Sequence, residues 1–284
     1  MEYKTLSNGI KIPILGFGVY QIPNIDECER VVSDAILVGY RLIDTAQSYK
    51  SEEAVGNAIR KSGIARENFF ITTKIWISNY GYEKAKASLD ASLAKLQTNY
   101  IDLVLLHQPF GDYYGAYRAM EEYYKAGKIR TIGISNFAPD RMADLAIFAD
   151  VTPMVNQIET HVFNQQLKAR QTMDEYGIQI ESWGPFAEGR NDFFTNETLV
   201  NIGRKYHKSA AQVALRYLIQ RDVIVIPKTV HKNRMEQNFD VFNFVLTKDD
   251  MEAILKLDMG ESQFFSHVDP ETVKRISSFK LEVM

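Results

Sequence analysis

The sequence predicts an α/β fold in which a short strand and a helix alternate eight times. Short stretches that are apolar on both faces recur along the 284 residues, as in strands of a parallel sheet covered by helices. Amphipathic stretches with helical spacing separate them. No proline-rich, serine-rich or low-complexity linker divides the chain, so residues 1–284 are expected to form one domain. Eight such units in this length are typical of a (β/α)8 (TIM) barrel.

The elements follow in a regular order. Asn8 and Gly9 are a strong signal for a tight turn and predict a β-hairpin, which precedes the first unit. A helix is expected to begin near Ser51, with the acids Glu52 and Glu53 in its first turn. The expected strands are residues 14–18, 41–46, 69–76, 101–107, 130–135, 154–159, 178–184 and 223–227. The clearest other helices are residues 26–39, 82–97, 116–127, 164–177 and 209–221.

A doubly wound sheet with a second domain is the alternative. Such a fold normally carries G-x-G-x-x-G after its first strand, where it binds a dinucleotide. Here Gly16 and Gly18 are followed by no third glycine at that spacing, which favours the barrel.

Composition excludes several classes of partner. A formal net charge of −3 without a basic run argues against nucleic acid. There is no apolar run long enough for a membrane span and no signal-peptide core, and Cys28 is the only cysteine, so we expect a cytoplasmic protein. The five histidines lack metal-binding spacings, and no metal is expected. A G-x-S-x-G elbow and a P-loop are also absent from the sequence.

Polar side chains stand at the ends of the predicted strands. In a barrel of this kind, the chemistry gathers where the strands end. The residues expected to converge at that mouth are Asp44, Lys74, His107, Ser135, Asn136, Gln157, Trp183 and Lys228.

Four of the residues near the mouth suggest carbonyl reduction. Lys74 interrupts an apolar strand, and Asp44 is its natural partner, although a turn-capping aspartate is the alternative interpretation. The Tyr49 phenol, with an ordinary pKa of about 10, is an available acid, and an adjacent ammonium is expected to lower that pKa. His107 could orient a carbonyl and stabilise negative charge on its oxygen, although a lone histidine there can be structural.

Because no side chain supplies hydride, a cofactor must. Lys228, Thr229 and Arg234 follow the last strand and open a short helix, with free backbone N–H groups available for an anion. Two cations favour a phosphorylated ribose, and therefore NADPH over NADH. A solvated basic loop is the alternative.

The sequence resembles the aldo-keto reductase superfamily over essentially the whole chain. Three stretches in the right order resemble its signatures: "GYRLIDTAQSYKSEEAVG" from Gly39, "RTIGISNF" from Arg130 and "IPKTVHKNRMEQNF" from Ile226. Trp183, where many mammalian members carry tyrosine, is similar to the prokaryotic 2,5-diketo-D-gluconate reductase-like branch. The resemblance implies a cytoplasmic, monomeric, metal-free, NADPH-dependent reductase of aldehydes or ketones. It also implies that the N-terminal hairpin closes the bottom of the barrel.

The resemblance also implies roles for individual residues. The catalytic tetrad would be Asp44, Tyr49, Lys74 and His107, with Tyr49 as the general acid. The cofactor-binding positions would be Ser135, Asn136, Gln157, Trp183, Gly184, Phe186, Lys228, Thr229, Val230, Arg234, Gln237 and Asn238. The substrate-binding positions would be Tyr20, Trp76, His107 and Gln108.

Two other functions and one structural expectation remain open at this point. A regulatory subunit could keep the barrel and sense the cofactor, although an intact tetrad argues against this. A barrel isomerase could use Lys74 and His107 without a cofactor. The tail after Asp258 is short, so we expect a truncated specificity loop and a more open pocket.

Overall fold

Eight parallel strands form the centre of the molecule. The computed structural model describes residues 1–281. The strands pair in chain order, and a parallel bridge between Leu15 and Val225 joins the first strand segment to the last. The strands are β3 (Gly16–Gly18), β4 (Leu42–Asp44), β5 (Phe70–Ile75), β6 (Leu103–Leu106), β7 (Ile132–Ser135), β8 (Val155–Glu159), β9 (Gln179–Trp183) and β10 (Ile224–Val225). Each lies inside its predicted stretch, so the barrel is confirmed and the doubly wound alternative is wrong.

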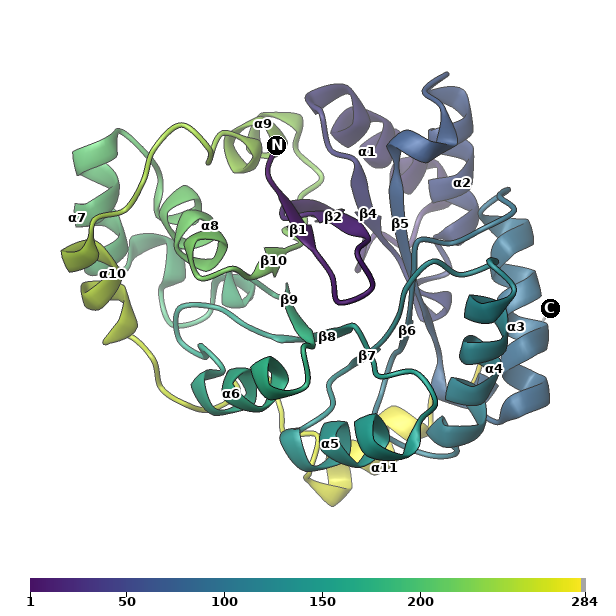
Figure 1. Cartoon of the computed structure of the whole chain (residues 1–284). Coiled ribbons are helices and arrows are strands. Elements are labelled where there is room, and N and C mark those ends of the chain that lie inside the picture. The colour runs from purple at the N-terminus through teal and green to yellow at the C-terminus, as the bar shows by residue number, and fades with distance from the viewer. Residues whose placement is uncertain (282–284) are drawn as a thin grey trace.

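Helices surround this barrel (Figure 1). The α-helices are α1 (Ile25–Val38), α2 (Glu52–Lys61), α3 (Tyr82–Lys95), α4 (Tyr113–Lys125), α5 (Pro139–Phe148), α6 (Leu167–Glu175), α7 (Glu197–Tyr206), α8 (Ala210–Gln220), α9 (Lys232–Phe239), α10 (Lys248–Leu255) and α11 (Pro270–Ser277). Short 3₁₀ turns are η1 (Gln47–Tyr49), η2 (Arg66–Asn68), η3 (Ile77–Asn79), η4 (Ala187–Gly189) and η5 (Phe193–Thr195). The predicted helix near Ser51 is α2, and the short helix expected after the last strand is α9. Helices α5, α7, α10 and α11 were not predicted individually.

The predicted N-terminal hairpin is present. Strands β1 (Tyr3–Thr5) and β2 (Lys11–Pro13) pair antiparallel, and Gly9 between them has a φ of 84°. Such a backbone conformation favours glycine. The Asn8 side chain donates to the carbonyl of Arg130 over 3.0 Å. Because Arg130 precedes β7, the hairpin lies across the end where the strands begin (Figure 1).

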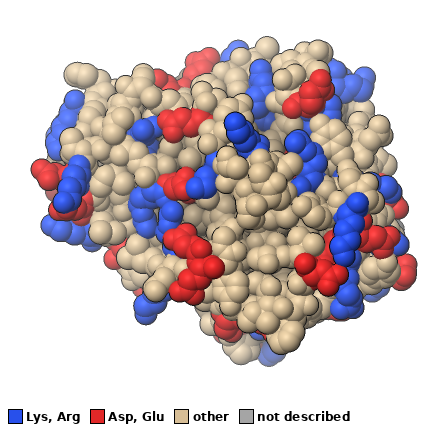
Figure 2. Space-filling view, in the orientation of Figure 1, with Lys and Arg blue, Asp and Glu red and all other residues tan. Residues whose placement is uncertain are grey.

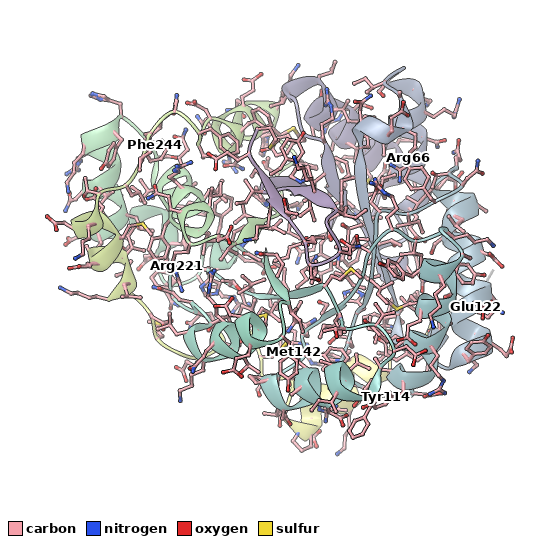
Figure 3. The ribbon with its side chains drawn as sticks, viewed as in Figure 1. Arg66, Tyr114, Glu122, Met142, Arg221 and Phe244 are labelled. Atoms are coloured by element: carbon pink, nitrogen blue, oxygen red, sulfur yellow. The ribbon has the colours of Figure 1, made fainter. Side chains whose placement is uncertain are left out.

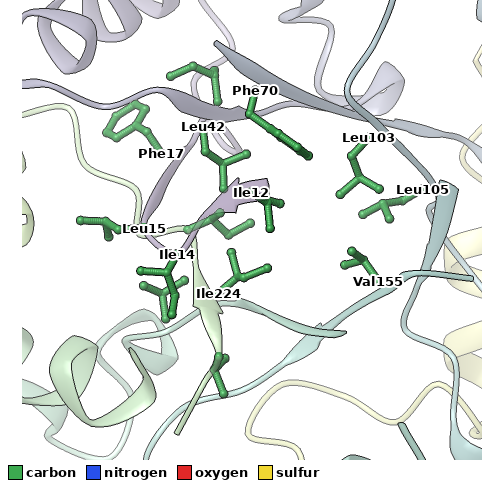
Figure 4. Packing of buried hydrophobic residues seen from close by; sticks show 14 of the residues in the cluster. Ile12, Ile14, Leu15, Phe17, Leu42, Phe70, Leu103, Leu105, Val155 and Ile224 are labelled. Carbon is green, nitrogen blue, oxygen red and sulfur yellow. The ribbon is translucent and has the colours of Figure 1, made fainter. Parts of the chain in front are cut away.

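Aliphatic and aromatic side chains fill the barrel below its mouth. Ile12 of the hairpin lies among residues from β3, β4 and β6, which include Phe17, Leu42 and Leu105 (Figure 4). All four are buried. The hairpin therefore supplies side chains to the core, and water is excluded from that end.

Buried Asp102 connects several segments near the start of β6. Its two carboxylate oxygens accept from Arg66 at 2.6 Å and from Arg130 at 2.7 Å, and one also accepts from the backbone N–H of Ile71 at 3.0 Å. Arg66 lies on the β5 side of the barrel (Figure 3). A buried carboxylate needs such partners, and here they join β5, β6 and the segment before β7.

Candidate active site

The carboxyl ends of β4, β5 and β6 bring the predicted tetrad together. Asp44 is the last residue of β4, Lys74 lies near the end of β5, and His107 follows β6. Tyr49 ends η1, the short turn that follows β4. Lys74 Nζ donates to Asp44 Oδ1 over 2.6 Å and to the Tyr49 hydroxyl over 3.4 Å. The predicted Asp44–Lys74 pair is therefore confirmed.

Lys74 is held as an ammonium ion. Its side chain is fully buried, and burial lowers the pKa of Lys74. Asp44 opposes this by charge and by its hydrogen bond, and Tyr49 adds to the opposition, so that the pKa of Lys74 is raised overall. The carbonyl oxygen of Thr45 accepts a further hydrogen bond from Nζ over 3.0 Å. A buried ammonium with three oxygen partners is thus available beside the phenol.

The pKa of Tyr49 is set by burial more than by the neighbouring ammonium. Burial raises the pKa of Tyr49 to about 12, because the penalty on the phenolate exceeds the opposing effect of Lys74. Asp44 also raises this pKa. Lys74 does lower this pKa, as predicted, but burial is the larger effect, so the pKa of Tyr49 is raised overall. Tyr49 consequently keeps its proton at neutral pH.

His107 is a neutral imidazole at the same mouth. Burial, followed by the charges of Lys74 and His267, holds the pKa of His107 well below its ordinary value. Its Nδ1 lies 3.3 Å from the Ser48 hydroxyl. When Ser48 donates in this pair, the imidazole proton is on Nε2 and can be donated to an oxygen at the mouth.

Four of the predicted nicotinamide-binding residues adjoin the tetrad. Ser135 Oγ donates to the Gln157 carbonyl over 2.7 Å, and Asn136 Nδ2 donates to the His107 carbonyl over 3.1 Å. Trp183 Nε1 donates to Asn136 Oδ1 over 2.8 Å. Asn136 has a φ of 65°, a left-handed conformation that asparagine tolerates better than most residues. These bonds join β7, β8 and β9 to the mouth where the tetrad lies.

Gln157 reaches across the barrel. Its strand, β8, is four places from β4 in the ring of eight, so that the two lie on opposite sides. Gln157 Nε2 nevertheless donates to Asp44 Oδ2 over 2.8 Å. The same nitrogen donates to Glu181 Oε1 over 3.0 Å. The nicotinamide set and the tetrad therefore share one hydrogen-bond network.

The other predicted cofactor residues lie beyond β9 and β10. Gly184 and Phe186 follow β9, and Phe186 packs against Phe193. Thr229 accepts from the backbone N–H of His231, the residue before α9, over 3.2 Å. The remaining members, which lie in the connection after β10 or on α9, are Lys228, Val230, Arg234, Gln237 and Asn238. In the part of the chain that the structure describes, neither Lys228 nor Arg234 takes part in an ion pair, so two cations are available to an anion.

Two of the predicted substrate residues pack on rings of the predicted tetrad. The Tyr20 ring lies 4.9 Å from the Tyr49 ring, and the Trp76 ring lies 5.0 Å from the His107 ring. The backbone of Gln108 is held by Tyr80, whose hydroxyl donates to the Gln108 carbonyl over 2.8 Å. The side-chain oxygen of Gln108 is buried without a hydrogen-bond partner.

The chain after Asp258 packs against two tryptophans near the tetrad. Trp76 Nε1 donates to the Phe279 carbonyl over 2.8 Å, and the two rings pack at 5.6 Å. Phe264 packs on Trp183 with ring centres 5.2 Å apart. The short tail thus contacts both tryptophans of the mouth, and a pocket more open than that of mammalian members stays a prediction.

Buried Glu159 attaches the tail to β8. Its carboxylate accepts from the Ser262 hydroxyl and, over 2.8 Å, from the backbone N–H of Gln263. His161 Nε2 lies 3.0 Å from the same carboxylate. Hydrogen bonds from His161, Ser262 and Gln263 outweigh burial and lower the pKa of Glu159, so it remains ionised at neutral pH. This attachment places the neighbouring Phe264 against Trp183.

Sequence reasoning missed Glu181 and the tail residues Phe264 and Phe279. Glu181 interrupts an apolar strand, as Lys74 does, so the signal was present. The two tail aromatics carry no comparable signal, because only folding places them on the mouth. Within residues 1–281, no group of three or more His, Cys, Asp and Glu side chains is arranged to hold a metal ion.

Known proteins resemble this chain in sequence and structure. Residues 15–259 match the Aldo/keto reductase family. Glyoxal reductase from Bacillus subtilis is 44% identical over 257 residues, covering 90% of this chain and 92% of the relative. The Bombyx mori aldo-keto reductase, solved in complex with NADP, is 33% identical with a TM-score of 0.87 and 96% of each chain covered. A structure named as a 2,5-diketo-D-gluconic acid reductase B is 41% identical, with a TM-score of 0.87 and 93% of each chain covered. The chain belongs to the aldo/keto reductase family.

Proposed function

We propose that this chain is an NADPH-dependent reductase of aldehydes and ketones, with Asp44, Tyr49, Lys74 and His107 as its catalytic tetrad. The observation that carries this proposal is the buried Lys74 ammonium, 2.6 Å from Asp44 Oδ1 and 3.4 Å from the Tyr49 hydroxyl. A phenol that faces a fixed ammonium can donate its proton and leave its negative charge stabilised.

Each tetrad residue has a distinct task. Tyr49 holds its proton at neutral pH, since burial raises its pKa to about 12, and donates the proton to the oxygen of the carbonyl. Lys74 stabilises the phenolate that remains, and Asp44 keeps Lys74 charged. His107, neutral, directs an N–H at the same oxygen and orients it toward Tyr49.

The described residues fit the proposed cofactor. NADPH, when bound, supplies the hydride that the carbonyl carbon accepts. Ser135, Asn136 and Gln157 present amide and hydroxyl groups for its carboxamide, and Trp183 presents a ring face. Gly184 and Phe186, which follow β9, would contact the cofactor as well. At the other end Lys228, Thr229, Val230 and Arg234 would hold the phosphorylated ribose, and Gln237 with Asn238 the adenine.

Small carbonyl compounds are the proposed substrates. Tyr20, Trp76 and Gln108 would form the pocket, together with the tail residue Phe279, whose ring packs on Trp76. A pocket lined by aromatic rings suits small aldehydes, and the name of the Bacillus subtilis relative points to α-dicarbonyls. The 2,5-diketo sugar acids form a second class to test, from the name of a structural neighbour.

The proposal includes the location, oligomeric state and partners of the protein. We expect a cytoplasmic monomer in which residues 1–284 form one domain that acts without nucleic acid. Figure 2 supports the last point, since positive and negative side chains alternate on the face shown without a large area of one sign. Among the helices described, none is both long and apolar enough to cross a membrane.

The decisive test is turnover of NADPH with glyoxal, methylglyoxal, simple aldehydes and a diketo sugar acid, run beside Tyr49→Phe. We expect reduction by the wild type, and a loss of at least about 100-fold in the variant with NADPH affinity unchanged. Full activity of Tyr49→Phe would overturn the acid assignment. NADPH binding without turnover would favour a sensing role, and no binding at all would favour the isomerase.

A further inference from the structure

Glu181 is a carboxyl group enclosed in the barrel beside the tetrad. It lies in the middle of β9 and is fully buried. Its neighbours in register are Gln157 of β8 and Ile224 of β10. Glu181 Oε1 accepts from Gln157 over 3.0 Å, while Oε2 is buried without a hydrogen-bond partner. The proposed mechanism gives this group no task.

The orientation of the Gln157 amide follows from its two acceptors. An amide nitrogen carries two hydrogens, and here one is donated to Asp44 Oδ2 and the other to Glu181 Oε1. Turning the amide over would place its oxygen against the Asp44 carboxylate. In the observed orientation, the amide oxygen of Gln157 accepts no hydrogen bond from residues 1–281. This oxygen is therefore free to accept one from the nicotinamide carboxamide.

Charge in this enclosure favours a neutral Glu181. Two acids, Asp44 and Glu181, share the single cation Lys74, which already pairs with Asp44 at 2.6 Å. A second buried negative charge would have no cation of its own. Burial raises the pKa of Glu181 to about 8, Asp44 adds to the rise, and Lys74 and the Gln157 hydrogen bond partly oppose it. The neutral acid accepts the hydrogen bond from Gln157 without adding charge beside the tetrad.

We infer that Glu181 is a positioning residue for the nicotinamide: it holds the Gln157 amide oxygen toward the carboxamide, and its ionisation strengthens binding of the oxidised, cationic ring relative to the reduced, neutral one. This inference rests on the proposed function. The second part is electrostatic, because a negative charge in a buried site attracts the positive charge that only the oxidised ring carries.

The other titratable groups of the mouth leave a window in which Glu181 can be observed alone. Burial raises the pKa of Tyr49 to about 12, and the pKa of Lys74 is raised because Asp44 and Tyr49 outweigh its burial. Burial lowers the pKa of His107 far below neutrality. Asp44 is paired with Lys74. Between about pH 7 and 9, Glu181 therefore changes charge while Tyr49, Lys74 and His107 do not. Because both cofactors carry the same 2′-phosphate, the ratio of their dissociation constants cancels its titration.

The test measures dissociation constants of NADPH and NADP⁺ by fluorescence titration from pH 7 to 9, without turnover. In the wild type we expect the ratio of the NADP⁺ constant to the NADPH constant to fall about fivefold over this range. Glu181→Gln keeps an acceptor for Gln157 but cannot ionise. Its dissociation constant for NADPH should therefore stay within about twofold of the wild-type value. The ratio of its two dissociation constants should not change with pH.

A second variant tests the positioning itself. Glu181→Met removes the acceptor, and we expect the NADPH constant to rise about fivefold, the effect of one hydrogen bond. In a Gln157→Ala background the same change should add nothing. Ile180→Val is the matched control, because this buried neighbour points to the other face of β9 and its small change should leave the NADPH constant unaltered. The melting temperature of each unliganded variant separates folding from binding.

The outcomes are distinct. An unchanged NADPH constant in Glu181→Met, or a pH-dependent ratio that survives in Glu181→Gln, would overturn the inference while leaving the reductase proposal intact. If Glu181→Met does not fold, the pH dependence of the ratio of dissociation constants in Glu181→Gln still tests the inference. A wild type that binds neither cofactor would overturn both.

Discussion

The indole N–H of Trp76 donates a 2.8 Å hydrogen bond to the carbonyl of Phe279, 203 positions further along the chain. This contact joins the segment after β5 to the tail beyond α11. Ser78, two residues after Trp76, repeats the connection, since its hydroxyl oxygen accepts from the backbone N–H of Leu281 over 3.1 Å. The tail therefore packs against Trp76, one of the residues proposed to hold the substrate.

Trp76→Phe should loosen the tail while keeping an aromatic ring in the pocket. We expect the Michaelis constant for a small dicarbonyl to rise about three- to tenfold, because one hydrogen bond and part of the ring packing are lost. The dissociation constant of NADPH should be unchanged. Steady-state kinetics and amide exchange of residues 276–281 measure the two effects. Val268→Ala, at an exposed tail position, serves as the control. An unaltered Michaelis constant together with unaltered exchange would contradict this role of the tail.

Lys74→Met should nearly stop reduction without preventing cofactor binding. The phenolate left after proton donation would lose its ammonium partner, so kcat should fall about 100- to 1000-fold. Because Asp44 would be left without its cation, some loss of thermal stability is also expected. Lys84→Met, at an exposed position on α3, is the matched control. A kcat within a few-fold of wild type would remove Lys74 from the proposed mechanism.

The alkaline behaviour of Tyr49 follows from its raised pKa. At saturating substrate and cofactor, loss of the phenol proton should not lower kcat for reduction until well above pH 10, because burial raises this pKa to about 12. The folded-state pKa is higher than that of about 10 in an unfolded chain. The contribution of the protonated Tyr49 phenol to the free energy of unfolding is therefore complete below about pH 10. It is lost as the pH rises toward 12. Unfolding by denaturant at pH 8, 10 and 11 checks the direction, and Tyr49→Phe should show a smaller decline.

Cofactor preference tests the residues that follow β10. Lys228→Ala and Arg234→Ala should each raise the NADPH dissociation constant at least about fivefold while changing that of NADH less than twofold, since only NADPH carries the 2′-phosphate. Lys232→Ala removes an exposed cation from the start of α9 and is the matched control. Equal effects on the two cofactors would contradict a phosphate site here.

Asp250 provides a stability test remote from the mouth. This buried carboxylate caps α10 through Thr247 and accepts from Lys205 and from the Tyr206 hydroxyl, both at 2.6 Å. These hydrogen bonds outweigh burial and lower its pKa to about 2. The stabilisation is present above the unfolded pKa of about 4 and is lost as the pH falls toward 2. Asp250→Asn should lower the free energy of unfolding by about 1–2 kcal/mol at pH 7, and the difference from wild type should shrink below pH 4. A difference independent of pH would contradict the charge argument.

Much of the site could be predicted because the strand ends of a barrel meet at one mouth. Lys74 was found because a lysine inside an apolar strand needs a partner, and the structure supplies Asp44. Glu181 carries the same signal, because it is an acidic residue inside an apolar strand, so the sequence contained the information needed to predict it. The direction in which the pKa of Tyr49 shifts could not be predicted from the sequence, because it depends on whether the effect of burial exceeds that of the neighbouring ammonium.

The sequence by itself determined the order of strands and helices, the hairpin at Asn8 and Gly9, and the residue types at each strand end. These features follow from local periodicity and turn chemistry, which neighbouring residues specify. Only the tertiary structure decided that Gln157 reaches Asp44 across the barrel and that Phe279 lies on Trp76. Those contacts join segments far apart in the chain, and their distances and burial exist only once the barrel has closed.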